Sequence, residues 1–460
     1  MTSTIRSIAF IVLYCFPGLP LQAQDAVTPA YEHFNKFNDV NGGWEASDAT
    51  ISLQLPDSNT LWLFGDCNIG EETSPFVIKG GTSTFINNAA IIEEDGVLTA
   101  YYQGTFDNPS SLIPSEDGDW FWPEHATIEN DTIKIFAIRI AHDDTGVPGF
   151  NFKVLTTHLA YFTYPGMEHI KTLEVDDITD PTMRFGTHVL KRDDYTYIFG
   201  KKDTVVDGLK YPVPMLARVK ESVEERWQFY AGDGNWTCNC IEAVPIGDRP
   251  MSESFFVHEH NGKFYLIMHE IWLIGELWLL EADSLTGPWN RTSSGGMEKK
   301  FCIIPKVGDN FTYNAFAHPH FRNEHGDILI SFNTNTSDFW SIWSDSRNYR
   351  GRFLWLNIDS AMNQVYPDTI HIYDMLVGMQ DAVTETSTKP MIRGDLQNIY
   401  IDRVDPHSEI IIYGLDGRIY YRCAANGSVS IPRTMLPNSI LLIQAEKNNH
   451  TYITRIFNSH

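Results

Sequence analysis

The chain has 460 residues, 43% of them hydrophobic, which is enough for one large globular domain and a smaller second one. Its formal net charge of −25, without a run of Lys and Arg, argues against nucleic acid and anionic membranes as partners, because both attract clustered positive charge. Aromatic residues make up 13% of the chain, a content typical of all-β cores and of surfaces that stack on sugar rings.

Residues 1–23 have the pattern of a signal peptide. "MTSTIR" supplies a positive charge, "SIAFIVLYCFPGLPL" is apolar, and "LQAQ" offers a small residue for cleavage at Ala23. The apolar stretch is too short to span a membrane comfortably, and no later segment reaches 18 apolar residues. The sequence therefore predicts an exported protein without a transmembrane segment.

The first strands of the mature chain predict a hairpin with an acid near each end. Residues 49–55 alternate ("ATISLQL"), "PDSN" is a turn, and "TLWLFGD" runs back in the opposite direction. Two strands of about seven residues return the chain to the same edge of the sheet. Asp48 and Asp66 are therefore expected to lie near each other.

Short apolar strands that follow a polar turn recur along the chain. "TLWLFGD" is followed by "TIKIFAIRI", "YTYIFGK", "KFYLIMHE" and "DILISFNTN", and aligned positions are separated by 63 to 72 residues. A plain β-sandwich would not show so regular a period, and long stretches with helical periodicity are absent from the sequence. The pattern predicts an all-β fold, a five-bladed β-propeller over residues 28–375.

The strand before each repeat would be the innermost of its blade and would line the central channel. These strands carry polar residues at similar positions: Asp48, Glu124, His125, Thr187, His188, Ser252, Glu253 and His318. Polar groups from every blade at one channel mouth are typical of a ligand site, although a water-filled channel would also be polar. For the histidines we favour the second interpretation, since no pair has metal-ligand spacing on one element, and we expect no metal or cofactor.

Five cysteines remain after the signal peptide: Cys67, Cys238, Cys240, Cys302 and Cys423. An odd number leaves at least one thiol unpaired within the chain. "CNC" at 238–240 lacks a second pair at zinc-finger spacing. Cys238 or Cys240 could form a disulfide with a distant cysteine, but the sequence does not show which one.

The composition changes after residue 375. Residues 376–396 are polar and rich in turn formers, which predicts a linker. Residues 397–460 are again rich in strands, too few for a sixth blade of the same period, and predict a small β-sandwich-like domain.

The stretch "GGWEASDA…TLWLFGD" resembles the opening of the domain-of-unknown-function families 4185 and 5005, the former associated with glycoside hydrolase family 183, the endo-D-arabinanases. Shorter matches are "FINNAA", "WFWP", "YTYIFG", "LARV", "SLTGPW" and "AHPH…ISFNTN". "GPW" is also similar to the furanosidase propellers of families 32 and 43. The resemblance covers roughly residues 35–375, and its members are five-bladed propellers.

This resemblance implies a secreted glycoside hydrolase that cleaves furanoside glycans of the arabinan type, with Asp48 and Asp66 as acid/base pair. Cys67 stands where the family commonly has Thr. The implied partner is a polysaccharide or oligosaccharide, and Trp120 or Trp122 could add to an aromatic floor. The residues expected to bind it are Trp44, Glu124, His125, Arg218, Glu253, His318 and Asn333.

Two other functions stay open. One is a non-catalytic glycan-binding propeller at the cell surface, which would bind glycan without releasing product. The other is an exo-acting furanosidase of the family 43 or 32 type, whose three acids would be Asp48, Glu124 and Glu253. Such an enzyme would release only monosaccharide.

The tail resembles a type IX secretion C-terminal sorting domain. "EIIIYGLDGRIYY" (409–421) is similar to its strand–turn–strand hallmark, and "LPNSILLIQAE" is similar to its closing strand. The resemblance implies that the type IX secretion machinery is a partner and that the protein is secreted or held at the cell surface.

Overall fold

The structure is a computed structural model of the chain. It describes residues 26–116, 118–145, 151–206, 209–270, 275–289, 299–308, 310–336, 339–363, 369–372, 391–394, 398–402, 404, 408–414, 418–425, 428–437, 439–447 and 450–458. The expected signal peptide and most of the expected linker lie outside these residues. In the described part, no helix is long and apolar enough to cross a membrane. The chain divides into two compact units, Met1–Leu376 and Val377–His460.

Five sheets of four or five strands make up most of the described part of the first unit. The first contains β2 (Val40–Asn41), β11 (Val97–Tyr101), β10 (Ala89–Glu94), β5 (Thr60–Phe64) and β4 (Ile51–Gln54). The second contains β14 (Trp120–Glu129), β15 (Thr132–His142), β16 (Phe152–Thr163) and β17 (His169–Glu174). The third contains β18 (Met183–Arg192), β19 (Tyr195–Val206), β20 (Leu209–Val219), β21 (Gln228–Gly232) and β22 (Asn235–Thr237).

The fourth sheet contains β23 (Phe255–His260), β24 (Lys263–His269), β25 (Leu277–Ala282), β26 (Phe301–Pro305) and β30 (Thr369–Ile372). The fifth contains β27 (Phe311–Arg322), β28 (Ile328–Asn335), β29 (Gly351–Leu356) and β1 (Val27–Pro29). Its last strand comes from the other end of the unit, because β1 pairs antiparallel with β29, Val27 opposite Leu356.

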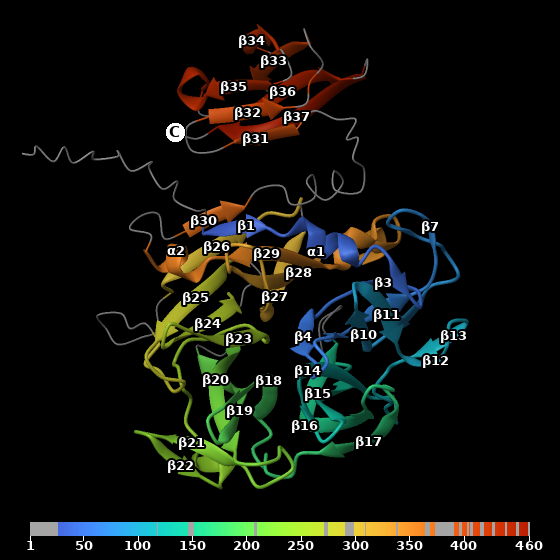
Figure 1. Cartoon of the computed structure of the whole chain (residues 1–460), viewed down its shortest axis with the longest axis vertical. Coiled ribbons are helices and arrows are strands. Elements are labelled where there is room, and N and C mark those ends of the chain that lie inside the picture. The colour runs from blue at the N-terminus through green and yellow to red at the C-terminus, as the bar shows by residue number, and fades with distance from the viewer. Residues whose placement is uncertain are drawn as a thin grey trace, which may run out of the picture. The chain divides into compact units, whose positions relative to one another are not determined.

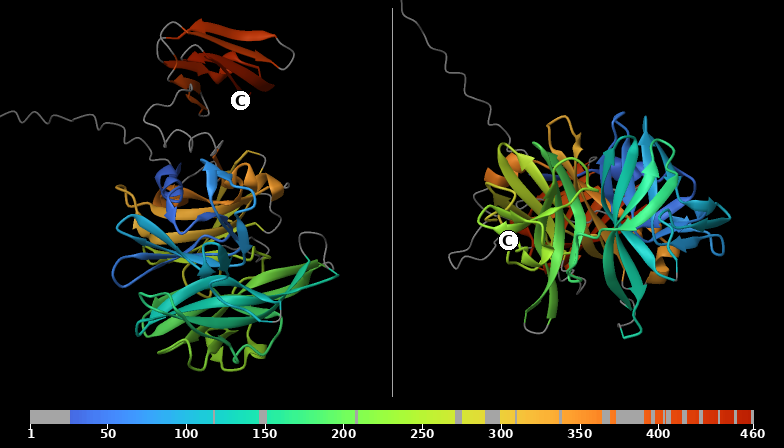
Figure 2. Two further views of the ribbon diagram at one scale, coloured as in Figure 1. Left: turned by 90° about the vertical axis from the view of Figure 1, so that its right-hand side faces the viewer. Right: turned by 90° about the horizontal axis from the view of Figure 1, so that it is seen from below.

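The five sheets are arranged around a common centre (Figure 1). One edge strand of each sheet is its innermost one: β4, β14, β18, β23 and β27 contact one another in a closed cycle. This is the propeller-like arrangement that the repeats predict. The end of the ring where these inner strands begin is called the mouth below. The long hairpins β15–β16 and β19–β20 are visible in teal and green in Figure 2.

Short turns join the paired strands. Asn130 and Asp131 connect β14 to β15, and Asn261 and Gly262 connect β23 to β24, all with positive φ. Two consecutive residues of this kind form the type I′ turn, whose twist matches that of a hairpin. The sequence "END" and "HNG" therefore produces tight hairpins at these places.

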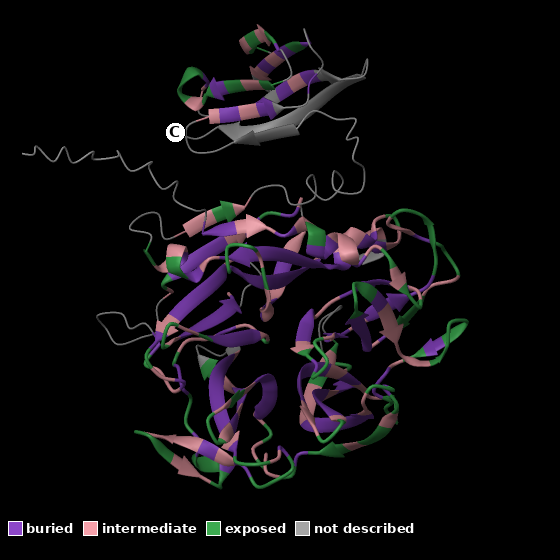
Figure 3. Cartoon of the chain, in the orientation of Figure 1, coloured by how far each residue is buried: buried purple, intermediate pink, exposed green. Residues whose placement is uncertain are grey.

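Hydrophobic clusters join neighbouring sheets face to face. One cluster, with Phe136, Phe185 and Trp227, packs the second sheet against the third, and another, with Phe199, Phe255 and Trp289, packs the third against the fourth. Buried residues dominate the strands that surround the centre (Figure 3). The large aromatic content of the sequence is thus mainly core.

Smaller sheets and short helices occur besides these five sheets. Three small sheets comprise β3 (Trp44–Ser47) with β6 (Cys67–Ile69) and β9 (Thr84–Ile86), β7 (Glu72–Ser74) with β8 (Val77–Ile78), and β12 (Gln103–Thr105) with β13 (Asn108–Ser110). The described helices are α1 (Tyr31–Lys36), α2 (Ile358–Asn363) and the 3-10 turns η1 (Cys240–Glu242), η2 (Phe339–Trp343), η3 (Ser346–Tyr349) and η4 (Arg433–Met435).

The described residues of the second unit form two sheets. One contains β31 (Met391–Gly394), β32 (Asn398–Asp402) and β35 (Ser428–Pro432), and the other contains β34 (Ile419–Ala424), β33 (Glu409–Gly414), β36 (Ser439–Lys447) and β37 (His450–Asn458). One hydrophobic cluster includes Ile399 and Ile431 of the first sheet and Ile410 and Ile443 of the second. Residues 391–394 were expected in the linker; that expectation is wrong, because they pair with β32.

Candidate active site

Asp48 and Asp66 lie opposite each other just beyond the ends of β4 and β5. The backbone N–H of Asp48 donates to the carbonyl of Asp66 (3.1 Å), and Gly65 N–H donates to the carbonyl of Asp48 (3.0 Å). The hairpin pairing of Ile51 with Leu63 therefore continues to the two acids. A Cβ at Gly65 would lie 2.5 Å from Oδ1 of Asp48, so a side chain at this position would displace the carboxyl group of Asp48. The predicted proximity is confirmed.

Two side chains hold one oxygen of Asp66. Nε1 of Trp122 donates to its Oδ1 at 2.9 Å, and Nδ2 of Asn87 donates to the same oxygen at 3.0 Å. Trp122 comes from β14 of the neighbouring sheet, and Asn87 follows β9. Hydrogen bonds to a carboxylate favour its ionised form and fix its orientation. Neither donor uses Oδ2 of Asp66.

Two tyrosines donate to Asp48. The hydroxyl of Tyr313, on β27, donates to its Oδ2 at 3.3 Å, and Tyr349 is the second donor. Asn333 of β28 donates to Oγ1 of Thr50 at 3.1 Å and to the carbonyl of Ser47 at 3.5 Å. Asn333 therefore holds the segment on either side of Asp48. A positive φ of 46° at Ala49 turns the chain between the acid and β4.

The environment keeps the proton affinity of both acids high. Burial, reinforced by the neighbouring Asp66, raises the pKa of Asp48 to about 8, while Tyr313 and Tyr349 act in the opposite direction. Burial raises the pKa of Asp66 to about 6, opposed by the hydrogen bonds from Trp122 and Asn87. The two carboxyls thus share one proton near neutral pH, with Asp48 as its main holder. Both side chains remain partly exposed, so a ligand can reach them.

Irregularities in three inner strands turn further polar groups toward the mouth. In β14, Glu124 and His125 together oppose Phe136, and in β27, Asn314 and Ala315 together oppose Phe332. In β18 the register shifts between Phe185 and His188. Bulges of this kind bend a strand and re-aim its side chains. In β14 and β18 they occur at positions that the repeat marks as polar.

Charged side chains from the second, third and fourth sheets meet beside β14 and β18. Nζ of Lys201 lies 2.8 Å from Oε1 of Glu124 and 3.1 Å from Oε2 of Glu253. Nη2 of Arg184 lies 2.7 Å from Oδ1 of Asp203 and 3.6 Å from Oε1 of Glu253. Both cations are almost completely buried, whereas the side chain of Glu253 is 58% exposed. Two buried cations thus support one accessible carboxylate.

The pKa values of the two glutamates shift in opposite directions. Desolvation would raise the pKa of Glu253, but the charges of Lys201 and Arg184 outweigh it and lower that pKa. For Glu124, desolvation prevails over Lys201 and raises the pKa. Glu253 is therefore an ionised hydrogen-bond acceptor at neutral pH.

Contacts close these groups into a ring around the mouth. Oγ of Ser254, beside Glu253, is 3.2 Å from Oδ1 of Asn314, which follows Tyr313 in the chain. We call the whole set the polar ring, and all five sheets contribute to it. Its members are Asp48, Asp66, Trp122, Glu124, Arg184, Lys201, Glu253, Ser254, Tyr313 and Asn314.

His125 and His318 do not belong to the polar ring, and their expected role in substrate binding is wrong. Nε2 of His125 is 3.1 Å from the carbonyl of Ser52, and its Nδ1 accepts from Val189 N–H at 3.0 Å. His318 is fully buried, with its ring nitrogens 2.6 Å and 2.8 Å from the hydroxyls of Ser52 and Ser331. Both residues connect neighbouring sheets.

Aromatic rings fill the centre below the mouth. The rings of His125 and His188 are 5.1 Å apart, those of His188 and Phe256 3.8 Å, and those of Phe256 and Phe316 4.9 Å. All four residues are buried. At this level the inner strands meet in a packed core, not in a polar channel.

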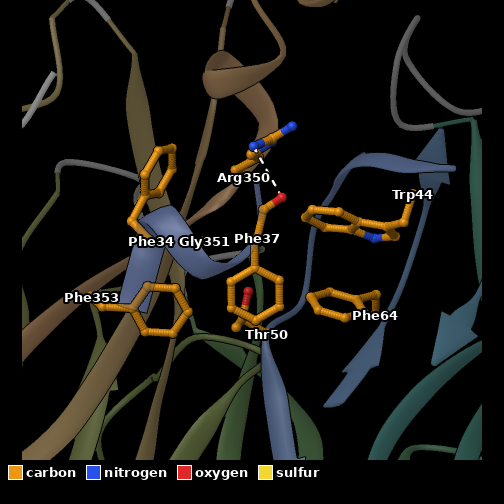
Figure 4. A pocket seen from close by; sticks show the side chains of 8 residues that line it. All are labelled: Phe34, Phe37, Trp44, Thr50, Phe64, Arg350, Gly351 and Phe353. Atoms are coloured by element: carbon orange, nitrogen blue, oxygen red, sulfur yellow. Dashed lines mark hydrogen bonds between the residues drawn. The ribbon is translucent and has the colours of Figure 1, made fainter. Parts of the chain in front are cut away.

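Trp44 was expected to contact substrate, and it does not reach the surface. Only 4% of it is exposed, and its ring lies 5.1 Å from Phe64 and 5.7 Å from Phe37. Figure 4 shows these rings and Arg350 around a cavity of about 10 Å³, room for about one water molecule. Trp44 is a core residue, so its assignment as a sugar platform is wrong.

Arg218 and Asn333 are also placed outside the mouth. Arg218 lies on β20, the third strand of its sheet, with its guanidinium 4.0 Å from the ring of Trp236 and 4.3 Å from that of Tyr195. Asn333 is fully buried behind Asp48. Neither contacts substrate in this arrangement, which contradicts their assignment; Asn333 instead positions the loop of Asp48.

Sequence reasoning missed Asn87, Arg184, Lys201 and Tyr313. Asn87 stands within "FINNAA" and Lys201 directly after "YTYIFG", two of the motifs already noted, but a motif does not show which side chain faces an acid. The five cysteines noted above are all free in the structure. Within the described residues, no group of three or more His, Cys, Asp or Glu side chains is arranged to hold a metal.

A ring of sheets with paired carboxylates at one mouth defines an all-β, propeller-like protein with a candidate acid–base site. Residues 31–358 match the model of the family described as domain of unknown function DUF5005. The chain therefore belongs to the DUF5005 family. No match was found among the curated proteins.

Solved structures resemble the chain at low identity. A candidate hydrolase from Bacteroides ovatus ATCC 8483 is 19% identical, with a TM-score of 0.58 over 74% of this chain and 93% of that one. The GH43 protein BlXynB from Bacillus licheniformis is 12% identical, with a TM-score of 0.38 over 91% and 90%. A family 43 arabinoxylan arabinofuranohydrolase from Bacillus subtilis is 11% identical, with a TM-score of 0.36 over 90% and 93%. The first similarity concerns the fold alone.

Proposed function

We propose that the protein is a secreted glycoside hydrolase that cleaves furanoside glycans of the arabinan type at the mouth of a five-bladed propeller formed by the five sheets. The observation that carries this proposal is the pair of Asp48 and Asp66, adjacent, accessible and held in different protonation states. Glycoside hydrolysis requires one carboxylic acid to protonate the leaving oxygen and one carboxylate to act as base or nucleophile.

We assign the roles from the surroundings of the two acids. Asp48, whose pKa is raised to about 8 by burial and by the charge of Asp66 beside it, keeps the proton and is the general acid. Asp66 is stabilised as a carboxylate by Trp122 and Asn87 and presents Oδ2 as the base or nucleophile. Two carboxyls with proton affinities driven apart by their surroundings are the usual arrangement for acid–base chemistry near neutral pH.

Glu253 fits a binding role better than a catalytic one. The exo-acting alternative would use a third acid from the inner strands, but Lys201 and Arg184 keep Glu253 ionised and Glu124 is occupied by Lys201. An ionised, exposed carboxylate accepts hydrogen bonds from sugar hydroxyls. The fold similarity to a candidate hydrolase agrees with the proposal.

Export and surface location are part of the proposal. We assign residues 1–23 to a signal peptide and the second unit to a type IX sorting domain that engages the secretion machinery. The support is the N-terminal pattern together with two strands, β33 and β34, that pair antiparallel where the hallmark motif is found.

The test is hydrolysis of a panel of arabinans and fructans by the wild type, Asp48→Asn and Asp66→Asn. Each substitution keeps the side-chain shape and removes the titratable group, so we expect each to lower turnover by about 10²–10⁴-fold. The double variant should be scarcely worse, because members of one catalytic unit are not additive. Asp57→Asn, at the turn of the same hairpin, is the matched control and should retain full turnover.

Two results would contradict the proposal. Near-wild-type turnover in either Asn variant would make that acid structural. Binding of a glycan by the wild type without release of any sugar would identify a non-catalytic glycan-binding propeller instead.

A further inference from the structure

Two groups of partly exposed aromatic side chains lie at the mouth. On the second sheet, the rings of Trp120 and Trp122 are 6.2 Å apart, and Phe152 meets Trp122 edge to face at 4.7 Å. On the fifth sheet, the rings of Phe311 and Tyr313 are 5.7 Å apart. All five side chains are partly exposed, unlike the aromatic residues of the central core.

One residue of each group donates a hydrogen bond to a different aspartate. Trp122 donates to Asp66 and Tyr313 donates to Asp48. Strand β4, which follows Asp48, contacts both β14 and β27, so the two groups stand on opposite sides of the hairpin that carries the acids (Figure 1). The bond to be cleaved would therefore have aromatic rings to both sides.

The rings are held in fixed positions. Trp120 and Trp122 alternate with buried Phe121 on one strand and so share one face, as do Phe311 and Tyr313 around Thr312. A hydrogen bond to an acid and an edge contact orient Trp122 in addition. Flat apolar faces kept rigid and accessible beside polar groups suit the binding of sugar rings, because little conformational entropy is lost on stacking.

The charges of the polar ring favour an uncharged sugar. Its cations, Lys201 and Arg184, are buried and engaged with Glu124, Glu253 and Asp203. Asp66 and Glu253 add accessible negative charge at the mouth. A uronic acid would meet repulsion there, whereas hydroxyl groups find acceptors.

We propose that the two aromatic groups are sugar subsites on either side of the acid pair, so that the enzyme binds a neutral glycan chain across the mouth and cleaves it internally. This inference rests on the proposed function and deepens it. The group around Trp120 binds the chain on the Asp66 side, and Phe311 with Tyr313 binds it on the Asp48 side.

The experiment uses Trp120→Ala and Phe311→Ala, neither of which touches an aspartate, and a ladder of linear arabino-oligosaccharides labelled at the reducing end. Trp236→Ala, a partly exposed tryptophan on the outer strand β22, is the matched control. We expect internal cleavage by the wild type and a loss in kcat/KM of roughly three- to tenfold in each mouth variant on long oligosaccharides. The two variants should shift the preferred cleavage position toward opposite ends, and the control should leave it unchanged.

The outcomes separate the inference from the proposed function. Release of single sugars only, or unchanged kcat/KM in either mouth variant, would overturn the two-sided subsites although hydrolysis itself is confirmed. If the wild type cleaves nothing, the proposed function is wrong. The inference is then tested by measuring how tightly the wild type and the variants bind the same oligosaccharides. Weaker binding in both mouth variants, but not in the control, would support it, and unchanged or absent binding would overturn it.

Discussion

Asp48 and Asp66 are the same amino acid at adjacent backbone positions, and they differ in what donates to them. Asp66 receives hydrogen bonds from Trp122 and Asn87 at one oxygen, whereas Asp48 receives them from Tyr313 and Tyr349. Such donors stabilise the charged form of each acid, while burial, together with the charge of Asp66 on Asp48, leaves the shared proton on Asp48. At the residue scale, the chemistry is set by neighbours from β14 and β27 more than by the acids themselves.

Replacing Trp122 by Phe tests this asymmetry. The ring stays and the donor to Asp66 is lost, so the pKa of Asp66 should rise by about one unit. Asp66 must be ionised to act, and the acidic limb of the kcat/KM profile should therefore move to higher pH by the same amount. Trp236→Phe should leave the limb unchanged. A limb that stays in place in Trp122→Phe would show that Asp66 does not govern it.

Asp48→Asn should also change stability. The folded pKa of Asp48, about 8, exceeds that of an unfolded aspartate, so its contribution to stability is present at low pH and is lost as pH rises from about 4 to 8. Asn does not titrate, so the variant does not lose stability in this way as pH rises. At neutral pH its melting temperature should exceed that of the wild type by a few degrees, since each kcal/mol in the free energy of unfolding corresponds to roughly 2–4 °C. Calorimetry at several pH values should show the gap widening with pH. A gap that stays constant would contradict the raised pKa.

At the scale of elements, the hairpin of Asp48 and Asp66, the inner position of five strands and the polar sites on them could be predicted from turns, alternation and period. The direction of individual side chains could not, because the bulges in β14 and β27 break the two-residue alternation. Glu124 thus reaches Lys201 while His125, its neighbour, enters the core. Contacts between sheets, such as the hydrogen bond from Trp122 to Asp66, depend on the closed ring and cannot be predicted from the local sequence.

The inner histidines act as connectors between sheets. His318→Ala would leave Ser52 and Ser331 without their partner and open a cavity in a fully buried site, so we expect a loss of about 2–4 kcal/mol in the free energy of unfolding. Denaturant titration measures it. His325→Ala, at an exposed loop, is the control and should change the free energy by less than about 0.5 kcal/mol. An equally small effect at His318 would rule out the connecting role.

At the scale of the whole molecule, the regular spacing of the repeats predicted the ring, whereas composition alone could not place the first residue of the second unit. We predict that a chain ending at Leu376 folds and keeps its hydrolytic activity, because the hydrophobic clusters of the five sheets lie within the first unit. Circular dichroism and the rate on arabinan measure this. The shortened protein should fail to reach the cell surface; normal surface display would refute the sorting role.

The pairing of β1 with β29 has a consequence for how the molecule is made. Val27 precedes and Leu356 follows the strands of the first four sheets except β30, so the pairing between them cannot form until these strands have been synthesised. The hairpins within each sheet need only local sequence and can form early, while this pairing carries a large loop-closure entropy. The three residue pairs that join β1 to β29 can therefore form only after the hairpins of the fifth sheet.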